Sequence, residues 1–282
     1  MVQAHCQRRV QGHRGEEPVN APIGVFDSGV GGLSILQALQ RHMPAEDFVY
    51  MADSAHAPYG ERSEAFIIDR SLRIAQFLLE QGAQVLVVAC NTATAAAVRE
   101  IRTEHPHVPV VGVEPGVKPA VALSRNGRVG VMATPGTLSS QKFRDLVAAH
   151  GGQAHVVMQP CPGLAKEIEK GELDTTALRE LVQGFCMPLK AAQVDTVVLG
   201  CTHYPFVAPL IQQAMGPEVQ LLDTADAVAR HTARLIARLP APPRAGQGLP
   251  GTQLWSSGAP DHLAQVAERW LGVRAPSLHL KV

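Results

Sequence analysis

The sequence predicts an α/β protein in which mainly parallel sheets are flanked by helices. After residue 20, short apolar runs of strand length alternate with helical patterns, which is typical of parallel sheets covered on both faces. The pattern restarts part-way, because residues 128–137 resemble residues 23–29, and a strand ending in a cysteine follows each at a similar spacing. We therefore expect two similar α/β units, with functional groups at the carboxyl ends of their strands.

In the first unit a strand opens at Ile23 and leads through a glycine-rich turn into a helix. Ser63 is placed to cap a second helix, which Gly82 ends, and an alanine-rich helix follows the third strand. The further strands expected in this unit are 48–53, 85–90 and 108–113.

The second unit opens with the strand and turn at 128–137 and continues in the same alternation. The further strands expected are 155–158, 194–200, 219–222 and, last in the chain, 253–258. The helices expected are one opening at Cys161-Pro162 and holding Glu169, one at 178–192, one containing Pro205 and Leu210, and those at 224–239 and 261–271. Residues 240–251 are rich in proline and glycine and predict a surface loop.

Composition and charge exclude several classes of function. The 282 residues suffice for two domains, and 25 Lys plus Arg balance 25 Asp plus Glu. With no basic run, nucleic acid and anionic membranes are not expected as partners, and the apolar runs are too short to span a membrane. Five cysteines without dense spacing indicate reduced thiols in the cytosol. Residues 1–20 lack the apolar core of a signal peptide and predict a disordered tail.

Two of the cysteines end apolar strands and lead into polar turns, Cys90-Asn91-Thr92 and Cys201-Thr202-His203. One such cysteine is usually a small core residue, but two presented alike indicate one site. Asn91 and Thr202 can cap the following helices, and a thiol at a helix N-terminus has its thiolate stabilised by the helix dipole. Two thiols facing each other across a cleft can remove a proton from one face of a carbon and return one to the other, which is a two-base racemisation or epimerisation.

Other uses of these groups are disfavoured by spacing. A zinc site at Cys201 and His203 lacks the CxxC or HxxxH pair that would complete it, and a redox dithiol usually has CxxC spacing. The Gly29-Val30-Gly31-Gly32 turn resembles part of a dinucleotide fingerprint, but the third glycine would fall at Ser34. No lysine motif indicates pyridoxal phosphate. We expect neither metal nor cofactor.

Several polar residues near these turns have two interpretations. Asp27 either caps the first helix or binds an ammonium group or orients a thiol. His203 is either a capping residue or a partner that shares a proton with the thiol of Cys201. Tyr59 and Gly60 form a tight loop or part of a pocket rim, and Glu169 on its own is typical of a solvated helix position.

Four segments resemble the signature segments of bacterial glutamate racemase, within the aspartate/glutamate racemase family. They are DSGVGGLS at 27–34, PYG at 58–60, ACNTAT at 89–94 and LGCTHYP at 199–205. The resemblance covers about residues 22–272. The two cysteine motifs are shared with aspartate racemases, whereas the DSGVGGLS opening is more specific to the glutamate enzymes.

The resemblance implies an isomerase that interconverts L- and D-glutamate without cofactor or metal and supplies D-glutamate for peptidoglycan, and so for cell-wall biogenesis and cell shape. It implies that Cys90 and Cys201 are the two bases, assisted by Asp27 and His203. The residues that match substrate-contacting segments are Asp27, Ser28, Tyr59, Gly60, Asn91, Thr92, Thr202 and His203. Asp53 and Glu169 match further acidic positions.

The resemblance also implies two pseudo-symmetric domains with the active site in the cleft between them. The first domain would comprise 21–114 and 224–282, and the second 115–223. It further implies a cytoplasmic homodimer. The chain departs from the family in carrying Ala259 where an acidic residue is frequent, and in a less bulky segment at 161–165, which weakens the Glu169 match. The alternatives are an aspartate or other amino-acid racemase, or a non-catalytic ligand-binding protein of the same fold.

Overall fold

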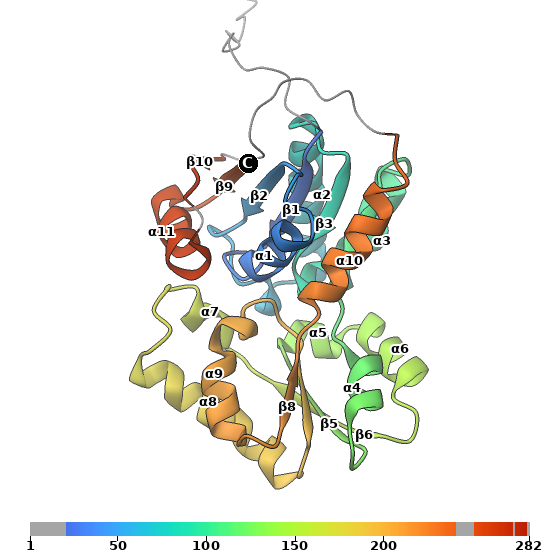
Figure 1. Cartoon of the computed structure of the whole chain (residues 1–282), viewed down its shortest axis with the longest axis vertical. Helices are drawn as coiled ribbons and strands as arrows, with labels where there is room; N and C mark the ends of the chain where they lie inside the picture. The colour runs from blue at the N-terminus through green and yellow to red at the C-terminus, as the bar shows by residue number, and fades with distance from the viewer. Residues whose placement is uncertain (1–20, 241–250, 273, 281–282) are drawn as a thin grey trace, which may run out of the picture.

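The computed structural model describes residues 21–240, 251–272 and 274–280. It contains two parallel sheets, each flanked by helices, and they lie one above the other in Figure 1. The predicted α/β class is therefore confirmed. The tail predicted at 1–20 and most of the loop predicted at 240–251 lie outside the described residues.

The larger sheet has the strand order β10-β9-β2-β1-β3-β4, with every neighbouring pair parallel. Its strands are β1 (Ile23–Asp27), β2 (Phe48–Ala52), β3 (Val85–Val88), β4 (Val110–Gly112), β9 (Thr252–Ser256) and β10 (Ser277–His279). The helices around it are α1 (Leu33–His42), the 3₁₀ turn η1 (Tyr59–Glu61), α2 (Glu64–Glu80), α3 (Asn91–Glu104), α10 (Ala225–Ile236) and α11 (Pro260–Leu271).

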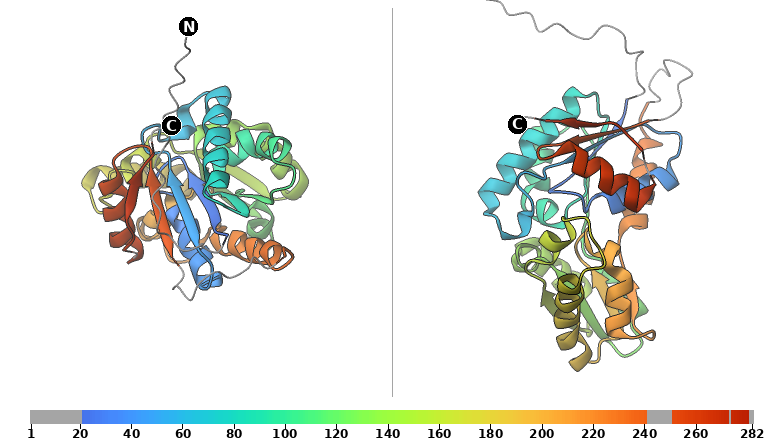
Figure 2. Two further views of the ribbon diagram at one scale, coloured as in Figure 1. Left: turned by 90° about the horizontal axis from the view of Figure 1, so that it is seen from above. Right: turned by 90° about the vertical axis from the view of Figure 1, so that its left-hand side faces the viewer.

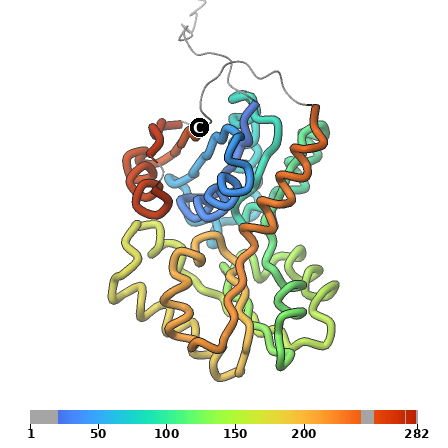
Figure 3. The backbone as a smooth tube through the Cα atoms, in the orientation of Figure 1, coloured from blue at the N-terminus to red at the C-terminus, as the bar shows by residue number. Residues whose placement is uncertain are grey.

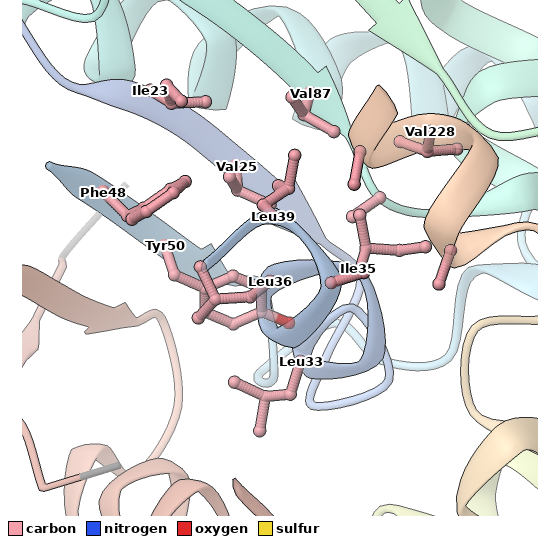
Figure 4. Close-up of a cluster of buried hydrophobic side chains, with 14 of the residues drawn as sticks. Ile23, Val25, Leu33, Ile35, Leu36, Leu39, Phe48, Tyr50, Val87 and Val228 are labelled. Atoms are coloured by element: carbon pink, nitrogen blue, oxygen red, sulfur yellow. The ribbon is translucent and has the colours of Figure 1, made fainter. Parts of the chain in front are cut away.

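Both faces of this sheet are buried, as expected for parallel strands. Val25 of β1 packs with α1, α10 and α11, whereas its neighbour Phe26 packs on the opposite face with α2 and α3. Figure 4 shows the first of these clusters, in which Leu36 and Leu39 of α1 lie against the sheet beside Tyr50 and Val25. The hydroxyl of Tyr50 donates to the carbonyl of Gly29 (2.7 Å), so this core also anchors the glycine-rich turn.

The smaller sheet has the order β6-β5-β7-β8 and is likewise parallel. Its strands are β5 (Arg128–Ala133), β6 (His155–Pro160), β7 (Thr196–Leu199) and β8 (Gln220–Leu222). Its helices are α4 (Val117–Leu123), α5 (Pro135–Ser139), α6 (Gln141–His150), α7 (Leu164–Ile168), α8 (Thr176–Ala191), the 3₁₀ turn η2 (Tyr204–Val207) and α9 (Ala208–Met215).

The chain passes between the two sheets twice, once after β4 and once after β8 (Figure 3). The boundaries predicted at 114/115 and 223/224 fall in these two passages. On this ground we propose them as the domain boundaries. Among the described residues, no helix is both long and apolar enough to cross a membrane.

Three local predictions were wrong. The last strand of the described chain is β10, not the strand at 253–258; three half-exposed or exposed residues at a sheet edge carry little periodic signal. The helix predicted to open at Cys161 begins at Leu164, because Gly163 takes a left-handed conformation (φ 76°). The helix expected directly after Cys201 is instead the turn η2 followed by α9, with Pro205 near the start of η2.

Candidate active site

Four predicted residues lie at the carboxyl ends of strands. Asp27 is the last residue of β1, Asp53 follows β2, and Cys90 and Cys201 follow β3 and β7. The two sheets present these ends to each other. The Oγ of Ser34, in α1, donates to the carbonyl of Thr202 in the turn after β7 (2.9 Å), which joins the two units next to the second thiol.

Cys90 is itself the N-cap of α3, where its Sγ accepts a hydrogen bond from the N–H of Ala93 (3.4 Å). Its thiol also lies 3.8 Å from the Oγ of Ser28. Burial raises the pKa of the Cys90 thiol well above its usual range, and the carboxylate of Asp27 and a charge on Cys201 raise it further. The two thiols are therefore within electrostatic reach of each other, as the two-thiol hypothesis requires.

Asp27 is fully buried and bound by the glycine-rich turn. Its Oδ1 accepts from the N–H of Ser28 (2.7 Å) and its Oδ2 from the N–H of Gly32 (2.6 Å). Burial raises its pKa, while the nearby His203 opposes that shift. The capping interpretation of Asp27 is partly right, because its carboxylate binds the N–H of Gly32, the N-cap residue of α1. The same carboxyl group also lies within hydrogen-bonding reach of the Cys90 thiol.

Cys201 has a different neighbour. Its Sγ lies 3.5 Å from Nδ1 of His203, and Nε2 of the same ring is hydrogen-bonded to the carboxylate of Glu169. Burial disfavours the charged form of His203, but Cys201 and Glu169 outweigh burial and hold its pKa well above the usual value. The raised pKa favours the protonated imidazole, which lies between Sγ of Cys201 and the carboxylate of Glu169.

The interpretation of Glu169 as a solvated helix residue was wrong. Its side chain is 14% exposed, and Oε1 also accepts from the N–H of Val30 in the glycine-rich turn (2.8 Å). A side chain on the turn would leave no room for these groups: a Cβ on Gly29 would lie 2.0 Å from Glu169, and one on Gly31 2.2 Å from His203. Sequence alone misses this because the contact spans 139 residues.

The two predicted helix caps were also wrong. Asn91 is the first residue of α3 rather than its cap, since the backbone of Cys90 already has the extended cap conformation. Thr202 precedes His203, which is the residue before η2. Asn91 and Thr202 nevertheless lie together beside Cys201, where they line a cavity of about 10 Å³, enough for about one water molecule.

Thr92 takes part in a hydroxyl cluster that the sequence reasoning missed. Its Oγ1 lies 2.9 Å from that of Thr134 and 3.2 Å from that of Thr137. All three side chains are buried, and the latter two sit at the start of α5 in the other unit. The Thr134-Pro135-Gly136-Thr137 turn after a strand was the available signal. The cluster joins the two units on the Cys90 side.

Asp53 and Tyr59 belong to a separate hydrogen-bond network. The carboxylate of Asp53 accepts from Nη2 of Arg70 (2.8 Å), from the hydroxyl of Tyr59 (2.5 Å) and from that of Ser257 (2.6 Å). Burial raises the pKa of Asp53, but these hydrogen bonds outweigh it and the net pKa is lowered. Tyr59 thus points its hydroxyl at Asp53. Gly60 packs against Thr134, where a Cβ would lie 2.7 Å from the threonine Cβ.

The site is closed around its thiols, since Cys90 is 6% exposed and Cys201 is 7% exposed. An amino acid can reach them only if the elements that cover them separate. Within the described part of the chain, no group of three or more histidine, cysteine or carboxylate side chains is placed to hold a metal ion.

The model of the Asp/Glu/hydantoin racemase family matches residues 23–232. The chain belongs to this racemase family. Among its relatives, a glutamate racemase of Ectopseudomonas mendocina is 49% identical over 255 residues, which are 90% of this chain and 96% of that protein.

Solved structures of family members have the same fold. One is the Escherichia coli glutamate racemase in complex with L-glutamate and the activator UDP-MurNAc-Ala, with a TM-score of 0.81, 31% identity, and coverage of 93% of this chain and 98% of that one. Another is the Francisella tularensis glutamate racemase in complex with D-glutamate, with a TM-score of 0.80, 28% identity and the same coverage. The family predicted from the four sequence segments is therefore confirmed.

Proposed function

We propose that this racemase interconverts L- and D-glutamate by proton transfer at Cα between two thiols, Cys90 and Cys201. The observation that carries the proposal is the pair of buried strand-end thiols, one next to a carboxyl group and one next to an imidazole, within electrostatic reach of each other. The similarity to glutamate racemases over most of the chain supports glutamate as the substrate.

In the proposed reaction one sulfur starts as a thiolate and the other as a thiol. The thiolate removes the α-proton and becomes a thiol, leaving the electron pair on Cα. The other thiol then donates its proton to the opposite face of Cα and becomes a thiolate, so the configuration inverts and no net proton is gained or lost. The reverse reaction uses the same two groups in exchanged roles.

An α-proton is a weak acid, so the site has to stabilise the carbanion that forms. Helix α3 begins at Asn91, immediately after Cys90, and its N-terminal N–H groups and dipole favour an α-carboxylate there. Exclusion of water strengthens these interactions, which fits thiols that are almost fully buried. We also assign Ser28, Asn91, Thr92 and Thr202 to substrate contact, because they lie beside the two thiols.

The remaining assignments are also part of the proposal. Asp27 assists Cys90, and His203 assists Cys201, with Glu169 behind it. Asp53, Tyr59 and Gly60 shape the wall of the site rather than take part in proton transfer. The reaction uses no cofactor or metal, its product D-glutamate supplies peptidoglycan, and the protein acts as a cytoplasmic homodimer.

Heavy water tests the proposal directly. Purified, metal-chelated protein is incubated with L-glutamate in heavy water without added cofactor, and α-deuterium and D-glutamate are followed together. We expect deuterated D-glutamate to appear. L-Aspartate in parallel tests the other substrate class that the family name includes. Faster turnover of aspartate than of glutamate would mean that aspartate is the substrate. If neither amino acid exchanged its α-proton, the protein would instead have a ligand-binding role.

A further inference from the structure

Helix α11 is the element of the larger-sheet unit that lies next to the Glu169 turn of the other unit. In Figures 1 and 2, α11 lies over α7 and the turn that follows it. The two chain passages lie nearer the α4 and α10 side of Figure 1. Separation of the sheets by rotation about these passages would therefore move the α11 side apart.

Three contacts close this side. Nε2 of His262 is hydrogen-bonded to the main-chain carbonyl of Glu169 (2.7 Å). Nη1 of Arg269 donates to the carbonyl of Gly171 (3.2 Å) and to the carboxylate of Glu172 (2.5 Å). Since both residues belong to α11 and their partners to the turn at 169–172, we call this set of contacts the α11 clasp.

The turn held by the α11 clasp lies between α7 and α11. On one side its backbone continues from α7, because the N–H groups of Glu169 and Gly171 donate to the carbonyls of Ala165 and Ile168 (2.9 Å each). On the other side it packs closely against α11, since Gly171 adopts φ 85° and a Cβ there would lie 3.1 Å from Val266. The α11 contacts therefore add to the support that α7 gives this turn.

Glu169 is the point at which the clasp meets the site. Its carbonyl is held by His262, while its carboxylate binds His203 and the N–H of Val30. Resting on the proposed two-thiol function, we infer that His262 is a positioning residue: by fixing the main chain of Glu169, it aligns the His203 imidazole on Cys201 and holds the site closed on the α11 side.

The first test measures closure without needing activity. Alkylation of Cys201 by iodoacetamide is followed by peptide mass spectrometry, which separates it from the other cysteines. His262→Leu removes the donor, and the rate should rise about 2- to 12-fold, the range for loss of one neutral hydrogen bond. His262→Gln retains an N–H donor and should stay near wild type. His231→Leu, at an exposed position on α10, is the matched control.

The second test reads alignment of the Cys201 step. The two enantiomers are equally stable, so kcat/KM in the two directions must change together, whereas α-deuterium isotope effects on kcat/KM need not. If His262→Leu slows proton transfer at Cys201 alone, the isotope effect should increase for the enantiomer whose proton Cys201 removes and decrease for the other. A general loss of structure would not shift the two effects in opposite directions.

The outcomes separate this inference from the proposed function. Unchanged alkylation together with unchanged isotope effects in His262→Leu would overturn the inference. If that variant does not fold, Arg269→Met replaces it and should show a smaller increase in alkylation, because the pair of Arg269 with Glu172 is exposed and such pairs contribute little. Absence of deuterium exchange in the wild-type protein would instead refute the racemase function, while the alkylation result would still report closure.

Discussion

The two thiols end equivalent strands but have opposite electrostatic surroundings. Cys90 lies beside the buried Asp27, and burial and that carboxylate raise the pKa of its thiol. Cys201 lies beside His203, whose pKa Cys201 and Glu169 hold well above its usual value against the effect of burial. Two similar units thus place an acidic residue beside one thiol and a basic residue beside the other.

This difference concerns the groups that carry protons next to the two sulfurs. The carboxyl neighbour favours the neutral thiol at Cys90, whereas next to Cys201 the raised pKa of His203 favours the protonated imidazole. A two-thiol proton transfer needs one sulfur as the acid and the other as the base, and these roles exchange between the two directions. Substitutions at these groups test the difference between the two thiols.

Removal of either thiol should have the largest effect. Cys90→Ala and Cys201→Ala each delete one acid–base group, and such groups contribute about 10²- to 10⁴-fold to rate. We expect racemisation to fall by about 10²- to 10⁴-fold, measured by circular dichroism of glutamate. Cys186→Ala is the matched control, because Cys186 is buried in the core of the smaller-sheet unit and should leave kcat within a few-fold. Near-normal racemisation by either active-site variant would exclude the two-thiol mechanism.

A second carboxyl group at a strand end, that of Asp53, extends the comparison. Asp53 differs from Asp27 in facing a buried arginine, Arg70, through a two-point contact (3.0 and 2.8 Å). Arg70→Met would remove the buried guanidinium and leave His56 as the basic neighbour of the carboxylate (3.0 Å), and we expect a loss of about 3–5 kcal/mol in the free energy of unfolding, measured by urea titration. Asp27→Asn should cost only about 1 kcal/mol, as for a neutral hydrogen bond. Equal losses would show that both acids serve stability.

The pH dependence follows from the lowered pKa of Asp53. A lowered folded-state pKa contributes stability above the unfolded value and loses it as pH falls through the folded value. This contribution should therefore persist through neutral pH and be lost only in acid below the reference value of 3.8. The stability difference between wild type and Arg70→Met should shrink there, and an undiminished difference would contradict the assignment.

The next prediction concerns His203, the basic partner of Cys201. His203→Asn removes the imidazole beside Cys201, and we expect kcat to fall by about 10²-fold. Because the pKa of His203 is raised in the folded state, its stabilising effect is present below the reference value of 6.5 and is lost as pH rises through the raised value. The melting temperature of wild type should therefore approach that of His203→Asn in alkaline buffer. A constant difference would mean that His203 is not charged. His231→Asn is the exposed control.

The sequence was sufficient for the repeated unit and both thiols because their signals are local. An apolar strand followed by Cys-Asn-Thr or Cys-Thr-His lies within one stretch of chain, and parallel topology then places strand ends together. The contrast between the thiols could not be derived from those stretches. It depends on Glu169 reaching across to Val30 and His203, and such pairings are set by packing of distant segments.

Other residues were missed or assigned incorrectly for related reasons. Asp27 and Asp53 follow similar strands, yet only Asp53 meets Arg70, which lies one helix later. His262 carries no motif and matters through a main-chain carbonyl 93 residues away. The resemblance identified Glu169, but single-residue reasoning placed it in solvent. The residues at strand ends and the pairing of Cys201 with its near neighbour His203 were therefore predictable, whereas the distant partners of Glu169, Asp53 and His262 were not.

Substitutions of glycine test how tightly the glycine-rich turn packs against His203. A Cβ on Gly31 would lie 2.2 Å from Nδ1 of His203, the atom that faces Cys201. Gly31→Ala should cost about 1–3 kcal/mol of stability and lower kcat by displacing that ring. Gly184→Ala is the control with the opposite sign: it lies exposed in α8 with open space around it, so alanine should stabilise the helix by about 0.5–1 kcal/mol. If Gly31→Ala lost stability but kept full activity, the ring could move without consequence, and its alignment on Cys201 would not matter.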